Sequence, residues 1–266
     1  MSEYLIQGET LTGIADAIRE KTGGTEPVAV SDMAGKIEGI QAGGGDDVLD
    51  ALIDRSITEI SSSSATSIGD YAFSHCSKLT TANFPAATSI RSSAFQFCDV
   101  LTTVDFPAVT SIGDHAFNYC SALTTVDFPA ATSIESSAFQ FCSALTTVDF
   151  PAATSIGNSA FNYCSKLTTA NFPAATSIES SALRSCDVLK ALLLRGNNVC
   201  ALSNTNAFNS TPIRSGTGYI YVPSALIEQY KAATNWSTYA AQFRALEDYT
   251  VDGTITGELD PAKTGT

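Results

Sequence analysis

The sequence contains few charged residues and almost no histidine. Asp, Glu, Lys and Arg make up 15% of its 266 residues, whereas roughly 25% is usual for a globular protein. The two histidines, His75 and His115, occupy variable positions of the repeat described below. A nucleophilic serine needs a histidine and a carboxylate beside it, so the abundant serines form no credible catalytic set. Since no phosphate-binding glycine motif is present either, we expect no catalytic residues, no cofactor and no enzymatic activity.

Basic residues are outnumbered by acidic ones. The chain has 14 Lys and Arg residues against 27 Asp and Glu residues, which gives a formal net charge of −13 at pH 7. Nucleic acids and anionic membrane surfaces are bound by clusters of Lys and Arg, so both partners are excluded. No apolar run approaches the ~20 residues that span a bilayer. Residues 1–4 lack the positively charged segment that opens a secretion signal, so we expect no such signal.

Cysteine occurs in an odd number, seven, and mostly at a regular spacing. Six of the cysteines recur every 22 residues: Cys76, Cys98, Cys120, Cys142, Cys164 and Cys186. Zinc sites need cysteine pairs two to four residues apart or histidine partners, and the sequence has neither. Stacked side chains of one column point in parallel, which disfavours a disulfide ladder. We therefore predict reduced, buried thiols that act as small hydrophobic side chains, and no metal site.

Three further columns share the 22-residue period. These columns are Ile68, Ile90, Ile112, Ile134, Ile156 and Ile178; Phe73, Phe95, Phe117, Phe139 and Phe161, with Leu183 in the sixth position; and Leu79, Leu101, Leu123, Leu145, Leu167 and Leu189. Four independent columns in one register cannot arise by chance, so the chain is built from an internal repeat.

One repeat unit combines a strand with a short helical turn. Val126 and Phe128 alternate with polar neighbours, which is strand periodicity. Pro129 ends the strand because it cannot donate a ladder hydrogen bond. Phe139 and Cys142 lie three residues apart, as in a turn of α- or 3-10 helix. A strand and a helical turn within roughly 20–29 residues form a leucine-rich-repeat unit.

We therefore predict an α/β leucine-rich-repeat solenoid over residues 57–223. A single coil cannot bury its apolar side chains, whereas stacked coils bury them in one continuous core. The strands are expected to form one parallel β-sheet of about eight strands, with short helical or 3-10 turns on the other side. The turns alternate between a Gly-Asp or Gly-Asn pair (first at 69–70) and an Arg- or Glu-Ser-Ser triplet (first at 91–93), which indicates duplication of a 44-residue double unit.

Both ends of the chain differ from the repeat. Residues 224–248 have helical periodicity and predict a C-terminal helical cap, followed by a mobile tail at 249–266. At the other end we predict a helical cap at 47–56, a Gly-rich linker at 43–46 and a helical attachment module at 1–42. The apolar face of that module comprises Leu11, Ile14, Ile18, Met33 and Ile37. A module of this size is too small to be stable alone, so it packs on a partner, on a second copy in an oligomer, or on the solenoid.

The motif Ala-Phe-x-x-Cys-x-x-Leu-x-x-Val-x-Phe-Pro-x-x-x-x-x-Ile resembles the repeat of the BspA-type bacterial leucine-rich-repeat family. The resemblance covers residues 57–223, and residues 218–236 are similar to the usual C-terminal end of these proteins. The chain departs from the general leucine-rich-repeat consensus at Ala131 and its equivalents, where Asn or Cys is usual. The neighbouring threonine column, of which Thr132 is a member, offers hydroxyl groups to the backbone of that turn instead.

A second resemblance concerns the N-terminus. The segment from Glu9 to Arg19, together with Ser31-Asp32-Met33, is similar to segments of tail and other virion proteins from phages and prophages of Gram-positive gut bacteria. This resemblance implies that residues 1–45 attach to other virion proteins, after assembly in the host cytoplasm, and that the solenoid faces outward.

Polar residues form the outward row of the predicted strands. The row comprises Asn83, Thr103, Asp105, Thr125, Asp127, Thr147, Asp149 and Asn171. Asp has a poor strand propensity, and Asp side chains stacked at about 4.8 Å repel one another. A row that opposes folding in this way favours a role in binding, either to a cation or to sugar hydroxyl groups. The alternative is a solvated face that discourages aggregation.

A row of aromatic residues directly precedes the cysteine column. It begins at His75 and continues with Phe97, Tyr119, Phe141 and Tyr163. Exposed aromatic side chains are typical of interaction surfaces, and their faces stack on sugars. The alternative is a ladder of rings between coils that stabilises the stack.

Together these features predict a non-enzymatic, virion-associated protein that displays a binding surface. Its expected role is adhesion to, or recognition of, a glycan or protein on a bacterial or mucosal surface. One alternative is a bacterial cell-surface adhesin, and another is a structural virion decoration protein without a ligand.

Overall fold

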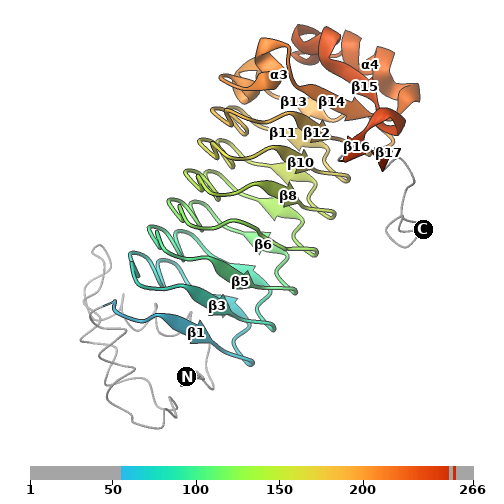
Figure 1. Cartoon of the computed structure of the whole chain (residues 1–266). Coiled ribbons are helices and arrows are strands. Elements are labelled where there is room, and N and C mark those ends of the chain that lie inside the picture. Colours follow the sequence, from blue (N-terminus) through green and yellow to red (C-terminus); the bar gives the residue numbers. More distant parts are fainter. Residues whose placement is uncertain (1–54, 252–253, 256–266) are drawn as a thin grey trace.

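The computed structural model describes residues 55–251 and 254–255, in which the chain winds into an elongated stack of coils (Figure 1). Parallel strands in stacked coils, with few helices, match the predicted leucine-rich-repeat solenoid at that level. The predicted attachment module, its linker and most of the N-terminal cap lie outside the described residues. The proposed attachment residues lie there too: Leu11, Ile14, Ile18, Met33 and Ile37. No helix in the described ranges is long and apolar enough to cross a lipid bilayer.

One set of strands lies along one face of the stack, and all of its members except the last match strands predicted from the sequence. They are β1 (Glu59–Ser61), β3 (Thr81–Asn83), β5 (Thr103–Asp105), β8 (Thr147–Asp149), β10 (Thr169–Asn171), β12 (Ala191–Leu193), β14 (Tyr219–Val222) and β15 (Phe243–Ala245). Pairing is parallel, and between repeat strands it joins equivalent residues of neighbouring coils, so that Asn83 lies opposite Asp105 and Asp149 opposite Asn171.

The prediction of one continuous sheet is wrong. These strands form a three-stranded sheet, β1-β3-β5, and a five-stranded sheet, β8-β10-β12-β14-β15. Between them, residues 125–127 contribute only an isolated bridge from Asp127 to Asp149. The sheet is therefore interrupted where three aspartates follow one another along the outward row.

A further parallel sheet, which the sequence did not predict, is formed by the Ser-Ile pair of each coil. Its strands are β2 (Ser67–Ile68), β4 (Ser89–Ile90), β6 (Ser111–Ile112), β7 (Ser133–Ile134), β9 (Ser155–Ile156), β11 (Ser177–Ile178) and β13 (Ala201–Leu202). All seven are joined in one sheet without interruption. This sheet therefore ties the coils together even where the first set of strands is divided.

The predicted helical turns are replaced by non-helical turns that contain two left-handed residues. In the coil after β7 these residues are Ser137 (φ 56°) and Phe141 (φ 62°). Their N–H groups point out of the coil and donate to the next one, Ser137 to the carbonyl of Asn158 at 2.8 Å and Phe141 to that of Asn162 at 2.9 Å. A helix would satisfy these donors internally, so the turn geometry is what links adjacent coils.

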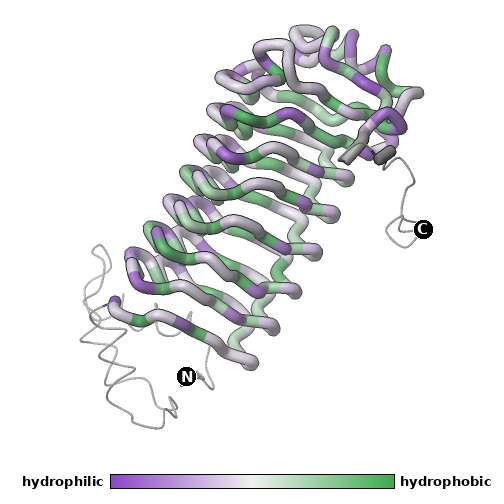
Figure 2. Tube along the Cα trace, in the orientation of Figure 1, coloured by the Kyte–Doolittle hydropathy of each residue, from purple (hydrophilic) through white to green (hydrophobic). Residues whose placement is uncertain are grey.

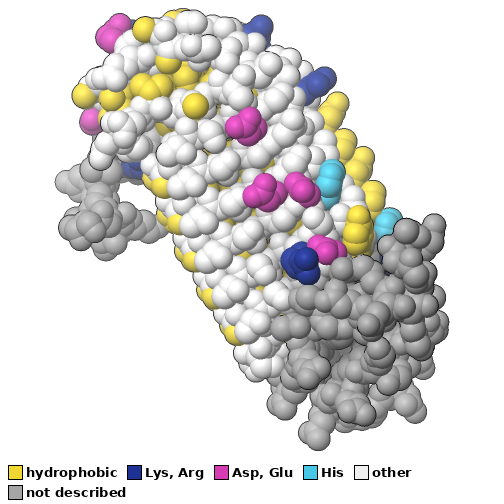
Figure 3. Space-filling view, turned by 180° about the vertical axis from the view of Figure 1, so that it is seen from behind, with side chains coloured by type: hydrophobic (Ala, Val, Ile, Leu, Met, Phe, Trp, Pro, Cys, Tyr) yellow, Lys and Arg dark blue, Asp and Glu magenta, His cyan; other side chains and the backbone are white. Residues whose placement is uncertain are grey.

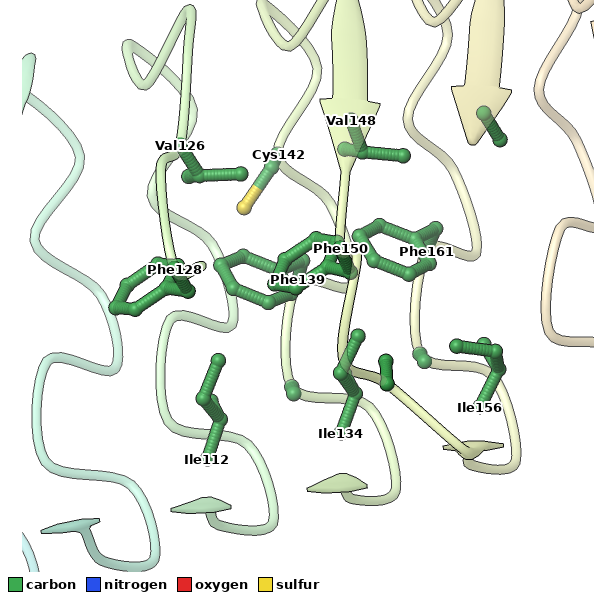
Figure 4. Close-up of a cluster of buried hydrophobic side chains, with 14 of the residues drawn as sticks. Ile112, Val126, Phe128, Ile134, Phe139, Cys142, Val148, Phe150, Ile156 and Phe161 are labelled. Carbon is green, nitrogen blue, oxygen red and sulfur yellow. The ribbon is translucent and has the colours of Figure 1, made fainter. Parts of the chain in front are cut away.

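Two columns of phenylalanine fill the interior (Figure 4). Within the column of Phe117 and Phe139 the rings stack with centroids 5.2 Å apart, and Phe139 also contacts Phe128 and Phe150 of the second column at 6.0 and 5.8 Å. Full burial of each ring contributes roughly 1.5–3 kcal/mol. Figure 2 shows that hydrophobic and hydrophilic residues recur at the same places in successive coils, as a shared core requires.

The cysteine column lies in this core, as predicted, and all seven thiols are free and buried. The thiol of Cys142 donates a hydrogen bond to the carbonyl of Phe117 in the preceding coil, with 3.2 Å between sulfur and oxygen. Cys98, Cys120, Cys164 and Cys186 make the same bond. Cysteine is therefore a small apolar side chain that also satisfies a buried carbonyl of its neighbour.

The C-terminal segment combines short helices with an added strand. Its elements are η2 (Thr205–Phe208), α3 (Pro212–Ser215), η3 (Ser224–Leu226), α4 (Ile227–Ala232), η4 (Trp236–Gln242) and η5 (Leu246–Asp248). The segment predicted as a purely helical cap also contains β15, which extends the sheet beyond β14. In the segment predicted as a tail, β16 (Thr250–Val251) and β17 (Thr254–Ile255) pair in antiparallel fashion.

The C-terminal core is tied to the solenoid through polar atoms of its aromatic residues. Trp236 donates its indole N–H to the carbonyl of Cys200 at 2.6 Å, and the hydroxyl of Tyr230 accepts the N–H of Cys200 at 2.9 Å. Both aromatic side chains are fully buried. Two ring side chains therefore satisfy the backbone of the last irregular coil.

The glycine of the Gly-Asp and Gly-Asn turns has a steric cause. A Cβ atom on Gly113 would lie 2.8 Å from the carbonyl carbon of Arg91 in the preceding coil, so only glycine fits there. The next residue, Asp114, accepts the backbone N–H of Ser136 in the following coil at 3.0 Å. A glycine coil therefore fits against a serine coil on either side, and the structural repeat is the 44-residue double unit.

This packing predicts a different response to alanine at two glycines. At Gly157 a Cβ atom would meet the backbone of Glu135 at 2.7 Å, whereas at Gly196 the nearest atom is the carbonyl oxygen of Pro173 at 3.6 Å. We expect Gly157→Ala to lower the free energy of unfolding by about 1–3 kcal/mol, because the backbones must separate. Gly196→Ala is the control and should change it little. Equal effects in chemical denaturation would contradict this account.

The buried thiols predict instability at alkaline pH. Burial raises the pKa of Cys76 from its ordinary value of 9.0 to about 11 and that of Cys200 to about 12, and it raises the pKa of Cys142 further. The thiols contribute fully to stability at a pH below their pKa in the unfolded chain. This contribution is lost as the pH rises toward their pKa in the folded protein. Above pH 9, each thiol that ionises on unfolding should remove roughly 1.4 kcal/mol per pH unit.

Denaturant titrations between pH 8 and 10 measure this slope. Cys142→Ala should reduce the slope by the share of one thiol, and iodoacetamide should label the folded protein far more slowly than the unfolded one. A flat pH dependence, or rapid labelling of the folded chain, would show that the thiols are not buried as described.

Candidate functional site

The outward row of the strands, named here the strand face, lies where the sequence predicted it. Six of its residues are exposed: Thr103, Asp105, Thr125, Asp127, Thr147 and Asp149. Asn83 and Asn171, at its two ends, are half-buried. Equivalent residues of paired strands lie opposite one another, so the side chains form a linear array with the spacing of the coils.

One end of the strand face is a hydrogen-bonded chain of polar side chains. Arg195 donates through Nε to Oδ1 of Asn171 at 3.4 Å, and Asn171 donates through Nδ2 to Oδ1 of Asp149 at 3.0 Å. These contacts hold the carboxylate and the amide in fixed orientations. At the opposite end, Oδ1 of Asn83 is buried and has no hydrogen-bond partner among the described residues. Hydrogen bonds therefore orient the polar side chains at the C-terminal end only.

The aspartates coincide with the division of the sheet. Asp105 belongs to β5, whereas Asp127 lies in a segment, residues 125–127, whose only pairing on this face is the bridge to Asp149. Val104, beside the division, is half-buried, although the equivalent Val148 is buried. Like charges that stack at strand spacing repel each other, which accounts for the looser pairing here. Within the described ranges, no group of three or more His, Cys, Asp or Glu side chains is arranged to hold a metal ion.

A tyrosine–arginine cluster lies beyond the C-terminal end of the strand face, separated from it by β12, whose equivalent residues Ala191 and Leu193 are buried. The guanidinium carbon of Arg244 lies 4.2 Å from the centre of the Tyr219 ring, a cation–π contact. Tyr221 packs edge to face against Tyr249 with centroids 4.9 Å apart. Partial burial, followed by the neighbouring Tyr249, raises the pKa of Tyr221, so its hydroxyl remains a hydrogen-bond donor at neutral pH.

These aromatic residues were not among the predicted site residues, although the sequence contains a signal for them. Tyr219 and Tyr221 alternate with Ile220 and Val222, which places both tyrosines on the outward side of a strand. Arg244 could not be placed with them from the sequence, because it reaches Tyr219 only when β15 pairs with β14.

The aromatic row forms a continuous ladder, named here the aromatic ridge. Adjacent rings from His75 through Phe97, Tyr119 and Phe141 to Tyr163 have centroids 4.3–4.8 Å apart and interplanar angles of 8–19°. All five residues have left-handed backbones, with φ between 60° and 62°. The inner rings have both faces covered by neighbours, so only their edges are available to a ligand. This geometry favours the ladder over the stacking of sugars on ring faces.

The threonine column donates hydrogen bonds to the turn backbone, as its position predicted. The hydroxyl of Thr132 donates to the carbonyl of Thr110 at 3.1 Å, and the backbone N–H of Thr132 donates to the same oxygen at 2.9 Å. Thr88, Thr110, Thr154 and Thr176 repeat the hydroxyl contact. These threonines therefore satisfy the turn backbone where leucine-rich repeats usually carry Asn or Cys.

The solved structures that resemble this chain include three leucine-rich-repeat proteins of low identity. A leucine-rich repeat protein from Bacteroides ovatus is 19% identical over 71% of this chain and 66% of that chain, with a TM-score of 0.41. The T. pallidum leucine rich repeat protein is 18% identical over 65% of this chain and 82% of that chain, with a TM-score of 0.49. A leucine rich cell surface protein from Faecalibacterium prausnitzii is 23% identical over 64% and 62%, with a TM-score of 0.41.

Comparison with family models is more informative. No protein of curated function matches the chain. The similarity of the N-terminal segment to virion proteins stays a prediction. The model of the BspA type leucine rich repeat region matches six copies, over residues 51–166 and 110–224, which together span most of the sequence. The chain therefore belongs to the BspA type leucine rich repeat family.

Proposed function

We propose that this protein is a non-enzymatic recognition protein that binds an extended ligand along its strand face. The observation that carries the proposal is the hydrogen-bonded chain from Arg195 through Asn171 to Asp149 at the C-terminal end of the strand face. Carboxylate, amide and hydroxyl groups at a repeated spacing of about 4.8 Å suit a ligand with regularly spaced polar groups. A glycan or an extended peptide on a bacterial or mucosal surface has that character.

The composition of the row supports binding over simple solvation. Asn occupies the same position as Asp in two coils, at Asn83 and Asn171, so the fold tolerates the uncharged residue. Three successive coils nevertheless carry Asp, where stacking like charges opposes folding. The aspartates destabilise the stack, and the neighbouring coils avoid this cost by carrying Asn. The charge therefore has a reason other than stability.

The place of display is a separate proposal. Residues 1–45 lie outside the described residues, and the resemblance of this segment favours attachment to a virion. Display on a bacterial cell surface is the alternative, and a decoration protein without a ligand is a third. Peptide mass spectrometry of purified particles and of washed cell envelopes from the source culture distinguishes display on a virion from display on a cell surface. A measurement of ligand binding tests whether the protein is a decoration protein without a ligand.

Loss of the preorganised amide should weaken binding. We expect Asn171→Ala to reduce binding of the full chain to immobilised mucin or to fixed Gram-positive cells by about tenfold, because it removes a charge-assisted contact and frees Asp149 and Arg195. Glu135→Ala, an exposed acidic residue outside the strand face, is the matched control. Binding that is equal in both variants, or absent from the native protein on both surfaces, would argue against this site.

Removal of one stacked charge should separate stability from recognition. Asp127→Asn should raise the free energy of unfolding by about 0.2–1 kcal/mol, since it relieves repulsion from the facing Asp149. The same variant should bind the mucin or cell surface less tightly than the native protein. A variant with unchanged stability would show that the carboxylates do not repel, and a variant with unchanged binding would show that they serve only as a solvated face.

A further inference from the structure

A second surface, beside the aromatic ridge, is not used by the proposed recognition function. Between the cysteine and leucine columns each coil carries two outward residues, named here the flanking pair. From the first repeat coil to the sixth the pairs are Ser77-Lys78, Asp99-Val100, Ser121-Ala122, Ser143-Ala144, Ser165-Lys166 and Asp187-Val188. Figure 3 shows apolar side chains gathered along one edge of the solenoid with few charges among them.

Several apolar side chains on this edge are partly exposed in the single chain. Tyr119 and Tyr163 of the ridge are 39% and 43% exposed, and Val100 and Val188 are 37% and 39% exposed. Together with Tyr71 they are the exposed large hydrophobic side chains among the described residues. An apolar stripe of this kind along one edge is unusual for a surface that faces only water.

The four charges of the flanking pairs also lack an ionic partner. Lys78, Asp99, Lys166 and Asp187 are all exposed. Within the described part of the chain the ion pairs are Arg91–Asp70 and Lys231–Glu228, and they involve none of these four. The charges on the edge are therefore available to a partner outside the chain.

The order of the flanking pairs is complementary to its own reverse. Read from the last coil to the first, each Ser-Lys pair comes opposite an Asp-Val pair, and the two Ser-Ala pairs come opposite each other. An antiparallel second copy would thus set Lys78 beside Asp187 and Val188, and Lys166 beside Asp99 and Val100. A parallel copy would instead set each lysine level with the same lysine and each aspartate level with the same aspartate.

We propose that the aromatic ridge and its flanking pairs form the interface of an antiparallel, two-fold symmetric dimer of this chain. In a two-fold interface each contact occurs twice, so two kinds of Lys–Asp contact become four ion pairs. The aliphatic stem of each lysine covers the exposed valine while its ammonium reaches the aspartate next to it. Ser-Ala pairs at the centre are small enough to let the exposed ring edges of the two ridges meet.

The size of the surface sets the expected affinity. Six coils at about 4.8 Å per coil give a strip roughly 25–30 Å long. Because this strip is narrow, the area that it buries is less than the ~800 Å² per partner of a standard stable interface. The dimer should therefore form in the micromolar range and weaken as ionic strength rises, because the lysine–aspartate pairs are exposed at its rim.

Charge reversal tests the pairing directly. Sedimentation velocity of the full chain over a concentration series should show a monomer–dimer equilibrium. The double variants D99K/D187K and K78D/K166D should each dimerise at least about tenfold more weakly, since every ion pair becomes a repulsion. An equimolar mixture of the two variants should form a heterodimer with near-native affinity. Circular dichroism and thermal unfolding establish that both variants remain folded.

Cross-linking tests the antiparallel register. Ala122 and Ala144 lie opposite each other in the proposed dimer, so a mixture of A122C and A144C should form a disulfide-linked heterodimer under mild oxidation. Neither variant alone should cross-link efficiently, and the seven native thiols are buried. A chain that is monomeric at hundreds of micromolar overturns the proposal. So does a dimer whose affinity charge reversal leaves unchanged, or one in which A122C cross-links to itself.

Discussion

Hydrogen bonding between successive coils is the constraint on which the rest of the structure depends. The backbone of Thr132 donates to the preceding coil, at Thr110, whereas the turn residue Ser137 donates to the following coil, at Asn158. Each coil is therefore bonded in both directions, and its rise is fixed near the strand spacing of about 4.8 Å. As a result every side chain of the repeat lies directly against the side chain 22 residues away. A position therefore accepts only a residue that can stack on the residue at the same position in the next coil.

This rule accounts for the unusual composition of the chain. Phenylalanine stacks on phenylalanine in the core, and cysteine is small enough to repeat while its thiol donates to the coil before it. Threonine repeats because its hydroxyl donates to the equivalent carbonyl. Long charged side chains gain little from such stacking and are repelled by their own copies, which explains why charged residues are scarce and why the aspartates of the strand face stand out.

The same rule decides what could be predicted from the sequence. The period, the core columns and the outward row of Asp127 follow from alternation, because burial repeats with the coil. The Ser133–Ile134 strand could not be predicted, since two residues show no periodicity and become a strand only through pairing with neighbouring coils. The left-handed backbone of Phe141 also contradicts local propensity, and it persists because hydrogen bonds and ring stacking on both sides determine it. The tyrosine–arginine cluster was missed for a related reason, because Arg244 joins it only through strand pairing.

The two sides of the coil consequently carry different tasks. The Ser-Ile sheet and the turn hydrogen bonds run without interruption from coil to coil, whereas the strand-face sheet is divided beside Asp105. A stack whose order is already fixed on one side tolerates unfavourable stacking on the other, so charges that weaken strand pairing can be retained on the strand face without loss of the fold. The proposed recognition by that face and the proposed association through the aromatic ridge would then use different surfaces of one scaffold, and neither surface includes the core columns.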